Sequence, residues 1–173
     1  MKLETLAVLL LLLTAAGMDW KTHRIPNWLT LSSLVSAVAA HAFLPEGEGV
    51  WRVLGGVAAG FALLVLPYAL GLMGAGDVKL LMAAGAWTGA ACTFHAFPWI
   101  ALFGGVLGLF TLVLHEGITG SCVRLHLACI TLRDNRFSAP TKQSATHLSY
   151  DMPYGIPIAL GFFTTFLAGG LFS

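Results

Sequence analysis

The heptapeptide MGAGDVK, residues 73–79, interrupts a strongly apolar chain with two glycines, a carboxylate and a lysine. Apolar runs lie on both sides of it, from about residue 50 to 73 and from 78 to 115. A carboxylate inside or at the edge of a membrane is costly and by default indicates function. Glycine tolerates unusual dihedrals and lets another backbone come close. The stretch therefore predicts a break between membrane-crossing helices that carries a functional acid.

The composition of the whole chain is that of an integral membrane protein. Of its 173 residues, 57% are hydrophobic and 10% are charged, whereas a soluble domain carries about 25% charged residues. The length fits a single membrane-embedded domain over residues 1–173. A net charge of +1 gives no reason to expect a nucleic-acid partner. Three cysteines without a CxxC pattern argue against a disulfide framework or a zinc site, and we expect neither a metal nor another cofactor.

Polar segments divide the chain into about six expected crossings. Four of them cover residues 3–18, 28–44, 50–73 and 153–172 approximately. The run from 78 to 115 is too long for one crossing of about 20 residues, so we expect a turn within TFHAFP, near Pro98. The predicted fold class is an all-α polytopic bundle in the lipid bilayer.

The cations favour this number of crossings and give the bundle an orientation. With the N-terminus outside, Lys21, Arg24, Lys79 and the four cations of residues 116–151 fall on the inner side, seven of nine in total. This is the bias that the positive-inside rule expects. Residues 121–133 are mostly apolar but carry two arginines, which makes them a candidate interfacial helix.

The same topology places two aspartates at one depth. Asp19 ends the first span and Asp77 begins the fourth, so both are expected at the inner membrane edge. Two nearby carboxyl groups do not both ionise easily and tend to share a proton. One can then take a proton from water while the other polarises a carbonyl, as in an aspartic peptidase. The residues alone leave open a helix cap or an ion pair with Lys21 or Lys79, and we expect Asp151 to cap the last helix.

Two motifs resemble the paired signatures of the type IV prepilin peptidases. The first is D-x-K-x-x-x-I-P-N, formed here by Asp19, Lys21, Ile25, Pro26 and Asn27. The second is G-x-G-D-x-K, formed by Gly74, Gly76, Asp77 and Lys79. A weaker match, MPYGIPIALG at 152–161, lies at the last span and contains Pro153 and Gly155. Both main motifs in this order, on one side of the membrane, are strongly specific.

The resemblance implies a polytopic aspartic peptidase of the bacterial inner membrane that acts at the cytoplasmic face. Its substrate would be a prepilin or pseudopilin with a basic leader and a hydrophobic N-terminal helix, cut after a glycine that precedes this helix. Carried over to this chain, Asp19 and Asp77 would be the catalytic pair, and the other residues of the two motifs would shape the site. Asp151, Pro153 and Gly155 would be accessory residues.

The chain begins directly with its first span and has no CxxC pair. In this it is similar to the short form of the family found with tight-adherence (Flp) pilus systems, which lacks the N-terminal zinc and methyltransferase domain. We therefore expect leader cleavage without N-methyltransferase activity.

Other classes of function remain open at this stage. A small membrane transporter could use the same aspartates as proton-relay sites, and a non-catalytic subunit of a pilus or secretion assembly could keep the fold without the chemistry. Transporters often show internal repeats and interrupted helices near the midplane, whereas these acids are expected at one edge. A preflagellin or signal-peptide peptidase of the same GxGD type is a rival within the same class. The pair of motifs favours the prepilin leader peptidase.

Overall fold

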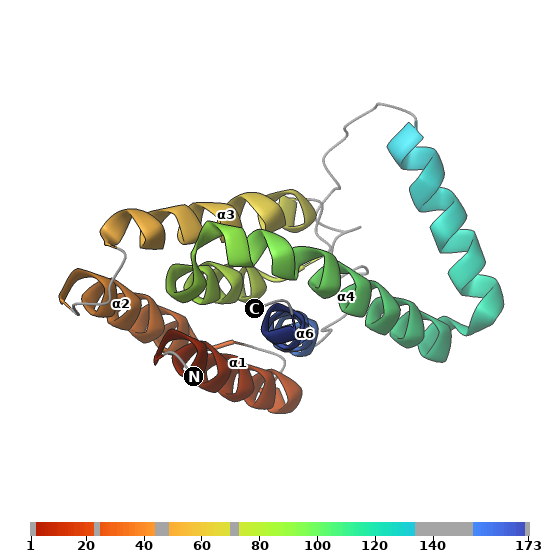
Figure 1. The fold of residues 1–173 in the computed structure, drawn as a ribbon. Coiled ribbons are helices and arrows are strands. Elements are labelled where there is room, and N and C mark those ends of the chain that lie inside the picture. Colours follow the sequence, from red (N-terminus) through yellow and green to blue (C-terminus); the bar gives the residue numbers. More distant parts are fainter. Residues whose placement is uncertain (1–2, 23–24, 44–48, 70–72, 134–153, 172–173) are drawn as a thin grey trace.

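The computed structural model describes residues 3–22, 25–43, 49–69, 73–133 and 154–171, and the side chains of residues 4–22, 25–43, 49–69, 73–111 and 154–169. These residues form five helices (Figure 1). They are α1 (Leu3–Thr22), α2 (Asn27–Phe43), α3 (Val50–Ala69), α4 (Ala75–Arg133) and α6 (Gly155–Leu171). The predicted all-α class is confirmed.

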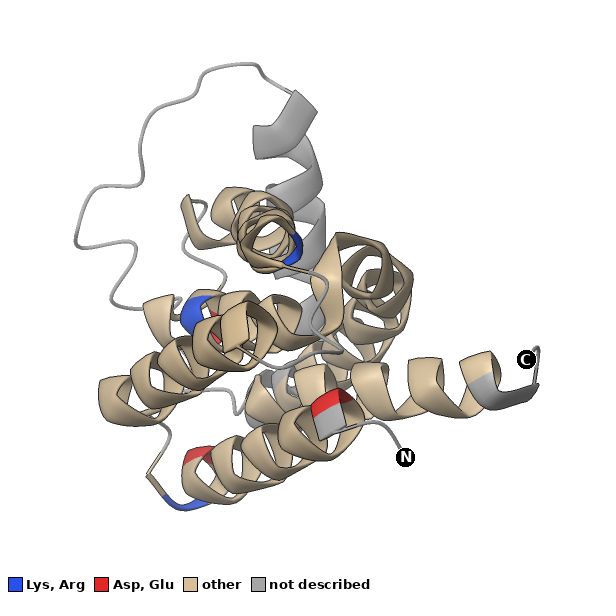
Figure 2. Cartoon of the chain, turned by 60° about the vertical axis from the view of Figure 1, so that its left-hand side comes forward, with Lys and Arg blue, Asp and Glu red and all other residues tan. Residues whose placement is uncertain are grey.

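Length and hydropathy make three of the helical stretches candidates for crossing a membrane. They are Glu4–Thr22, Val50–Ala69 and Ala75–Thr111, while Gly155–Gly169 is a shorter apolar helix. Charged residues whose side chains the structure describes lie near helix ends and leave the bodies of these helices uncharged (Figure 2). Trp20, Trp28 and Trp51 are also exposed near helix ends, where aromatic side chains gather at membrane–water interfaces. The surface therefore fits a bilayer.

α4 changes direction at Gly89. This glycine has a φ of +80°, a left-handed conformation that ends many helices and favours glycine. Two side chains from other helices reach the carbonyls just before it. Arg52 Nη2 donates to the Thr88 carbonyl oxygen at 3.2 Å, and His41 Nε2 lies 3.3 Å from the Trp87 carbonyl oxygen. Because the last carbonyls of a helix lack intrahelical partners, these contacts mark the end of a first segment of α4, residues 75–88.

The two segments of α4 run in opposite senses along α3. Gly60 of α3 lies against Leu81 of the first segment, whereas Gly55 lies against Ala90, where the second segment begins. Further along α3, Leu64 shares a cavity wall with Ile100. The chain therefore reverses at Gly89 (Figure 1).

The prediction that the chain turns near Pro98 is wrong, because the turn lies at Gly89. Pro98 lies inside the second segment of α4, and residues 94–98 are helical. A proline within a helix can kink it without reversing it, whereas a glycine at positive φ can end one. Residues 121–133 also belong to α4; the place of this stretch at the membrane surface stays a prediction.

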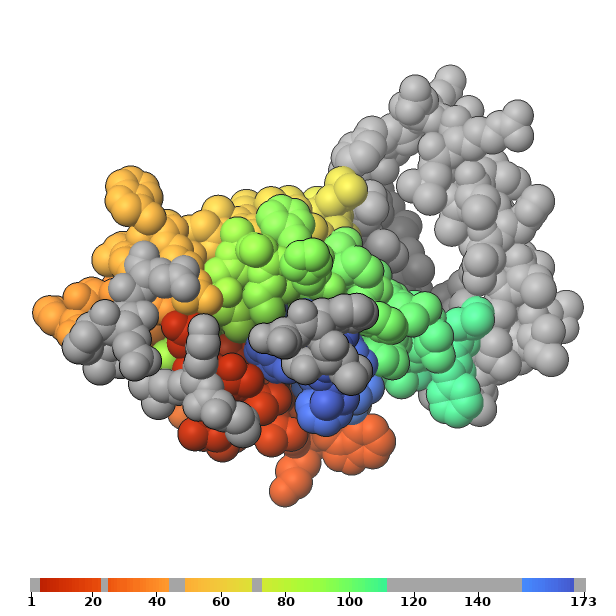
Figure 3. All heavy atoms as spheres, in the orientation of Figure 1, coloured from red at the N-terminus to blue at the C-terminus, as the bar shows by residue number. Residues whose placement is uncertain are grey.

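The first segment of α4 is the centre of the bundle. Residues 83–89 are all buried and mostly alanine or glycine, and such small residues let helices approach closely in lipid. A Cβ atom on Gly60 would lie 2.8 Å from the Leu81 carbonyl oxygen. α6 lies beside both α1 and α4 (Figure 3), and its residues Ile158 and Phe162 are fully buried. This packing brings the starts of α4 and α6 to the end of α1.

We expect Gly60→Ala to destabilise the bundle. The new methyl group would lie 2.8 Å from backbone of the neighbouring helix, and overpacking of this kind costs about 1–3 kcal/mol. Gly169→Ala is the matched control, because nothing lies within 4 Å of its added carbon and alanine favours a helix over glycine. Thermal unfolding in detergent measures both variants. Equal melting temperatures would contradict the close packing of α3 against α4.

Candidate active site

Asp77 lies in the first turn of α4, and its carboxyl group bonds back to the start of that helix. Asp77 Oδ2 accepts the Gly74 N–H at 3.1 Å, and the Asp77 N–H donates to the Gly74 carbonyl oxygen at 3.2 Å. An acidic side chain that reaches back from the third helical position has the geometry of half a capping box. The helix dipole favours negative charge at this end. The residue is nevertheless only 7% exposed.

Asp19 lies in the last turn of α1 but binds the start of a different helix. Asp19 Oδ2 accepts the N–H of Gly155, the first residue of α6, at 2.8 Å. Asp19 is 4% exposed. The carboxyl group therefore ties the end of the first helix to the beginning of the last one, and the predicted accessory residue Gly155 lies next to a predicted catalytic residue.

The fold brings the two carboxyl groups together. Asp19 and Asp77 lie within electrostatic range of each other, and the phenol of Tyr154 lies within range of Asp77. Burial, and then the Asp77 carboxylate, raise the pKa of Tyr154 above its ordinary value. The phenol therefore stays protonated at neutral pH, within electrostatic range of Asp77.

Three glycines make room for this arrangement. A Cβ atom on Gly74 would lie 3.3 Å from Asp77 Oδ2, and one on Gly155 would lie 2.9 Å from Asp19 Oδ2. A Cβ atom on Gly76 would lie 3.3 Å from the Cβ atom of Ile25. The first two glycines thus border the carboxyl groups, and the third allows the chain before α2 to pack against the start of α4.

The remaining motif residues join the two motifs or face outward. Lys79 Nζ donates to Asn27 Oδ1 at 2.9 Å, which links α4 to the first residue of α2. Pro26 directly precedes α2, and Lys21 is exposed at the end of α1. The predicted accessory residues Asp151 and Pro153 lie outside the described residues.

Tyr154 is a site residue that the motif comparison did not single out. It lies between Pro153 and Gly155 in the third, weaker motif. This position is the feature of the sequence that could have identified Tyr154 as a site residue. No group of three or more His, Cys, Asp or Glu side chains that could hold a metal is found within the described part of the chain. The groups that could take part in chemistry at this site are two buried carboxyl groups and the phenol of Tyr154.

Comparison with known families gives one match. A model of the type IV leader peptidase family matches residues 6–134. The chain belongs to this family. The matched region contains both main motifs and ends before α6. The contact between Asp19 and Gly155 therefore joins a helix outside the matched region to the site. Members of the family are aspartic prepilin peptidases, and this chain is accordingly an aspartic endopeptidase. Searches of curated proteins and of solved structures returned no match.

We expect Gly155→Ala to impair leader cleavage more than folding. The added carbon would lie 2.9 Å from Asp19 Oδ2, so the carboxyl group has to shift, and a displacement of about 1 Å can lower a rate about 100-fold. Cleavage of a prepilin by the purified variant, measured beside its melting temperature, tests this. Gly169→Ala, on the same helix with nothing within 4 Å of the added carbon, is the control. Unchanged cleavage by Gly155→Ala would show that the position of Asp19 does not matter.

Proposed function

We propose that this leader peptidase cuts the leader from a prepilin or pseudopilin with Asp19 and Asp77 as its catalytic pair. The observation that carries the proposal is that two buried carboxyl groups, each bound by the N–H at a helix start, lie within electrostatic range of each other. Membership of the type IV leader peptidase family supports the reaction class and the substrate.

In the proposed mechanism the pair holds one proton, because two close carboxyl groups do not ionise together readily. The ionised carboxylate takes a proton from the attacking water, and the protonated partner donates to the oxygen of the scissile carbonyl. The tetrahedral intermediate then collapses as the carboxyl group that took the proton of the water passes it to the leaving amine, and the diol returns a proton to the other carboxylate, which restores the singly protonated pair. The N–H groups of Gly74 and Gly155 orient the two carboxyl groups throughout.

We further propose six membrane crossings, with the aspartates at the cytoplasmic edge of the bacterial inner membrane. The crossings are α1, α2, α3, α6 and the two segments of α4 on either side of Gly89. The reversal at Gly89 supports this number, and the distribution of Lys and Arg supports the orientation. The ion pair between Arg52 and Glu4, at 3.2 Å, would then lie near the outer edge. The expected lack of methyltransferase activity and the similarity to tight-adherence systems stay predictions.

Asp19→Asn and Asp77→Asn are each expected to lower prepilin cleavage about 100-fold or more, the usual scale for loss of a catalytic acid or base. Asparagine keeps the shape of the side chain and an oxygen that accepts the glycine N–H, so both variants should fold. Co-expression with a prepilin and a gel shift measures processing, and purified protein in liposomes gives the rate.

Glu4→Gln is the matched control for these variants, since it makes the same change of acid to amide at the Arg52 pair. We expect it to process the prepilin normally. Full processing by Asp77→Asn would disprove the proposed pair. A purified wild type that cleaves no prepilin would favour the non-catalytic assembly subunit, and an Asp77-dependent ion flux without cleavage would favour the transporter.

Reporter fusions test the proposed orientation. Alkaline phosphatase, which is active only outside the cytoplasm, should be active when fused after Glu46 and inactive when fused after Lys21. A fluorescent protein that folds only in the cytoplasm should show the reverse pattern. The opposite result for both reporters would place the aspartates at the outer face.

A further inference from the structure

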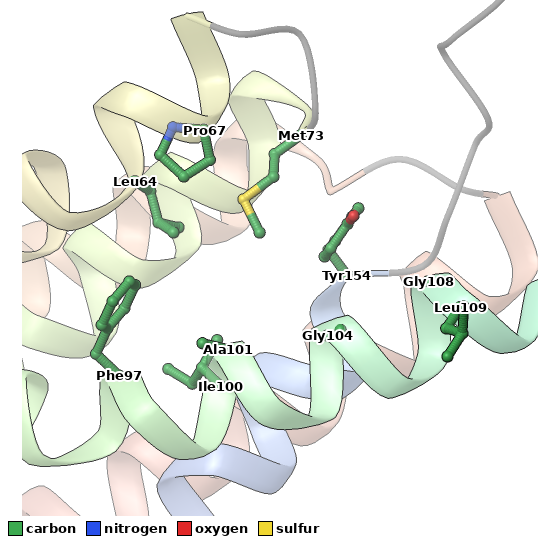
Figure 4. Close-up of a pocket in the computed structure, with 11 residues that line it drawn as sticks. Leu64, Pro67, Met73, Phe97, Ile100, Ala101, Gly104, Gly108, Leu109 and Tyr154 are labelled. Carbon is green, nitrogen blue, oxygen red and sulfur yellow. The ribbon is translucent and has the colours of Figure 1, made fainter. Parts of the chain in front are cut away.

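A cavity of about 490 Å³ lies between α3, α4 and the chain just before α6 (Figure 4), and the proposed mechanism makes no use of it. Its walls come from α3, from the second segment of α4 and from the chain just before α4 and α6. The residues that define it best are Leu64, Pro67, Met73, Phe97, Ile100 and Tyr154. Its volume is in the range of about 300–1,000 Å³ that is common for binding sites.

One wall of the cavity has almost no side chains. Ala101, Gly104, Gly105 and Gly108 line it from α4, spaced so that they share a face of the helix. Nothing lies within 4 Å of a Cβ atom built on Gly105. Helices in lipid approach each other most closely where small residues leave the backbone accessible. This wall therefore has room for the backbone and apolar side chains of another segment.

Two lining residues of the cavity are chain neighbours of the glycines that bind the aspartates. Met73 directly precedes Gly74, whose N–H bonds Asp77. Tyr154 directly precedes Gly155, whose N–H bonds Asp19. The same two short segments thus bind the carboxyl groups and line the cavity, which places the cavity next to the backbone that holds the two aspartates.

We propose that this cavity binds the first apolar residues of the prepilin after its scissile bond. The proposal rests on the proposed function and adds the direction in which the prepilin lies across the site. A prepilin offers a basic leader on one side of the cut and an apolar helix on the other, and the cavity lining is apolar apart from the Tyr154 phenol. The apolar side belongs in the cavity, and the leader extends the other way. Apolar binding remote from the reacting atoms then positions the scissile carbonyl between the two carboxyl groups.

Gly105→Leu tests the proposal by filling the cavity from its open wall. The variant should fold, since the new side chain meets no atom within 4 Å at its Cβ atom, and its melting temperature checks this. We expect kcat/KM for a prepilin to fall about tenfold or more, a loss equivalent to about 1.4 kcal/mol. Gly169→Leu makes the same substitution at an equally open position of α6 and should cleave like the wild type.

The outcomes separate this proposal from the proposed function. If the wild type cleaves and Gly105→Leu cleaves as fast as Gly169→Leu, the cavity does not bind the substrate, while the aspartate pair stands. If the wild type cleaves no prepilin, both proposals fail. A tenfold loss of kcat/KM that is confined to Gly105→Leu supports binding of the prepilin in the cavity.

Photo-crosslinking identifies what occupies the cavity. Benzoyl-phenylalanine at position 105, in an Asp77→Asn chain reconstituted in phospholipid vesicles with a prepilin, should form an adduct with the prepilin. The adduct should map to the first residues after the scissile bond, and the same probe at position 169 should give none with that segment. Adducts with lipid alone, or with the basic leader, would overturn the proposal.

Discussion

The site depends on one constraint: each of two buried carboxyl groups is bound by a backbone N–H at the start of a helix. Gly74 supplies this N–H to Asp77 at α4, and Gly155 supplies it to Asp19 at α6. A buried acceptor without a partner destabilises a fold by about 1–3 kcal/mol, and more when it is charged. Helix N-termini also carry a partial positive charge that favours an anion. The bond to Asp77 is local to the start of α4, whereas the bond to Asp19 fixes the start of α6 at the end of α1.

Small residues allow the helices to pack closely. α3 and the first segment of α4 approach at glycine positions such as Gly60, where a side chain would collide with the opposite backbone. α6 then packs against α1 and α4. Near the far end of the first segment, Arg52 and His41 bind the last carbonyls before the turn at Gly89. The first segment of α4 thus has hydrogen-bonded ends and an apolar, tightly packed middle.

Part of the site could be predicted from the sequence, because a residue at the end of an expected membrane span is expected at the edge of the membrane. Asp19 and Asp77 were expected at one edge on that ground, and the structure places them within electrostatic range. The turn within α4 was misplaced, because Gly89 is one of several glycines in a run of small residues and only its positive φ distinguishes it. The bond of Asp19 to Gly155 depends on a contact between the ends of two helices that hydropathy does not encode, whereas the bond of Asp77 to Gly74 is the helix cap that the residues alone left open. The cavity likewise forms between α3 and α4, and no local pattern indicates it.

The alternatives of a helix cap and a catalytic acid turn out to be compatible for Asp77. Its carboxyl group binds the start of α4, but a cap alone does not explain the rest of its surroundings. Glutamine also reaches back from the third helical position to the N–H of the residue before the helix, and it would bring no charge close to Asp19. Placing two carboxyl groups together, both nearly inaccessible to water, makes it hard to ionise both and lowers the stability of the fold. A purely structural subunit gains nothing from that arrangement, whereas a peptidase needs one ionised and one protonated carboxyl group at the same carbonyl.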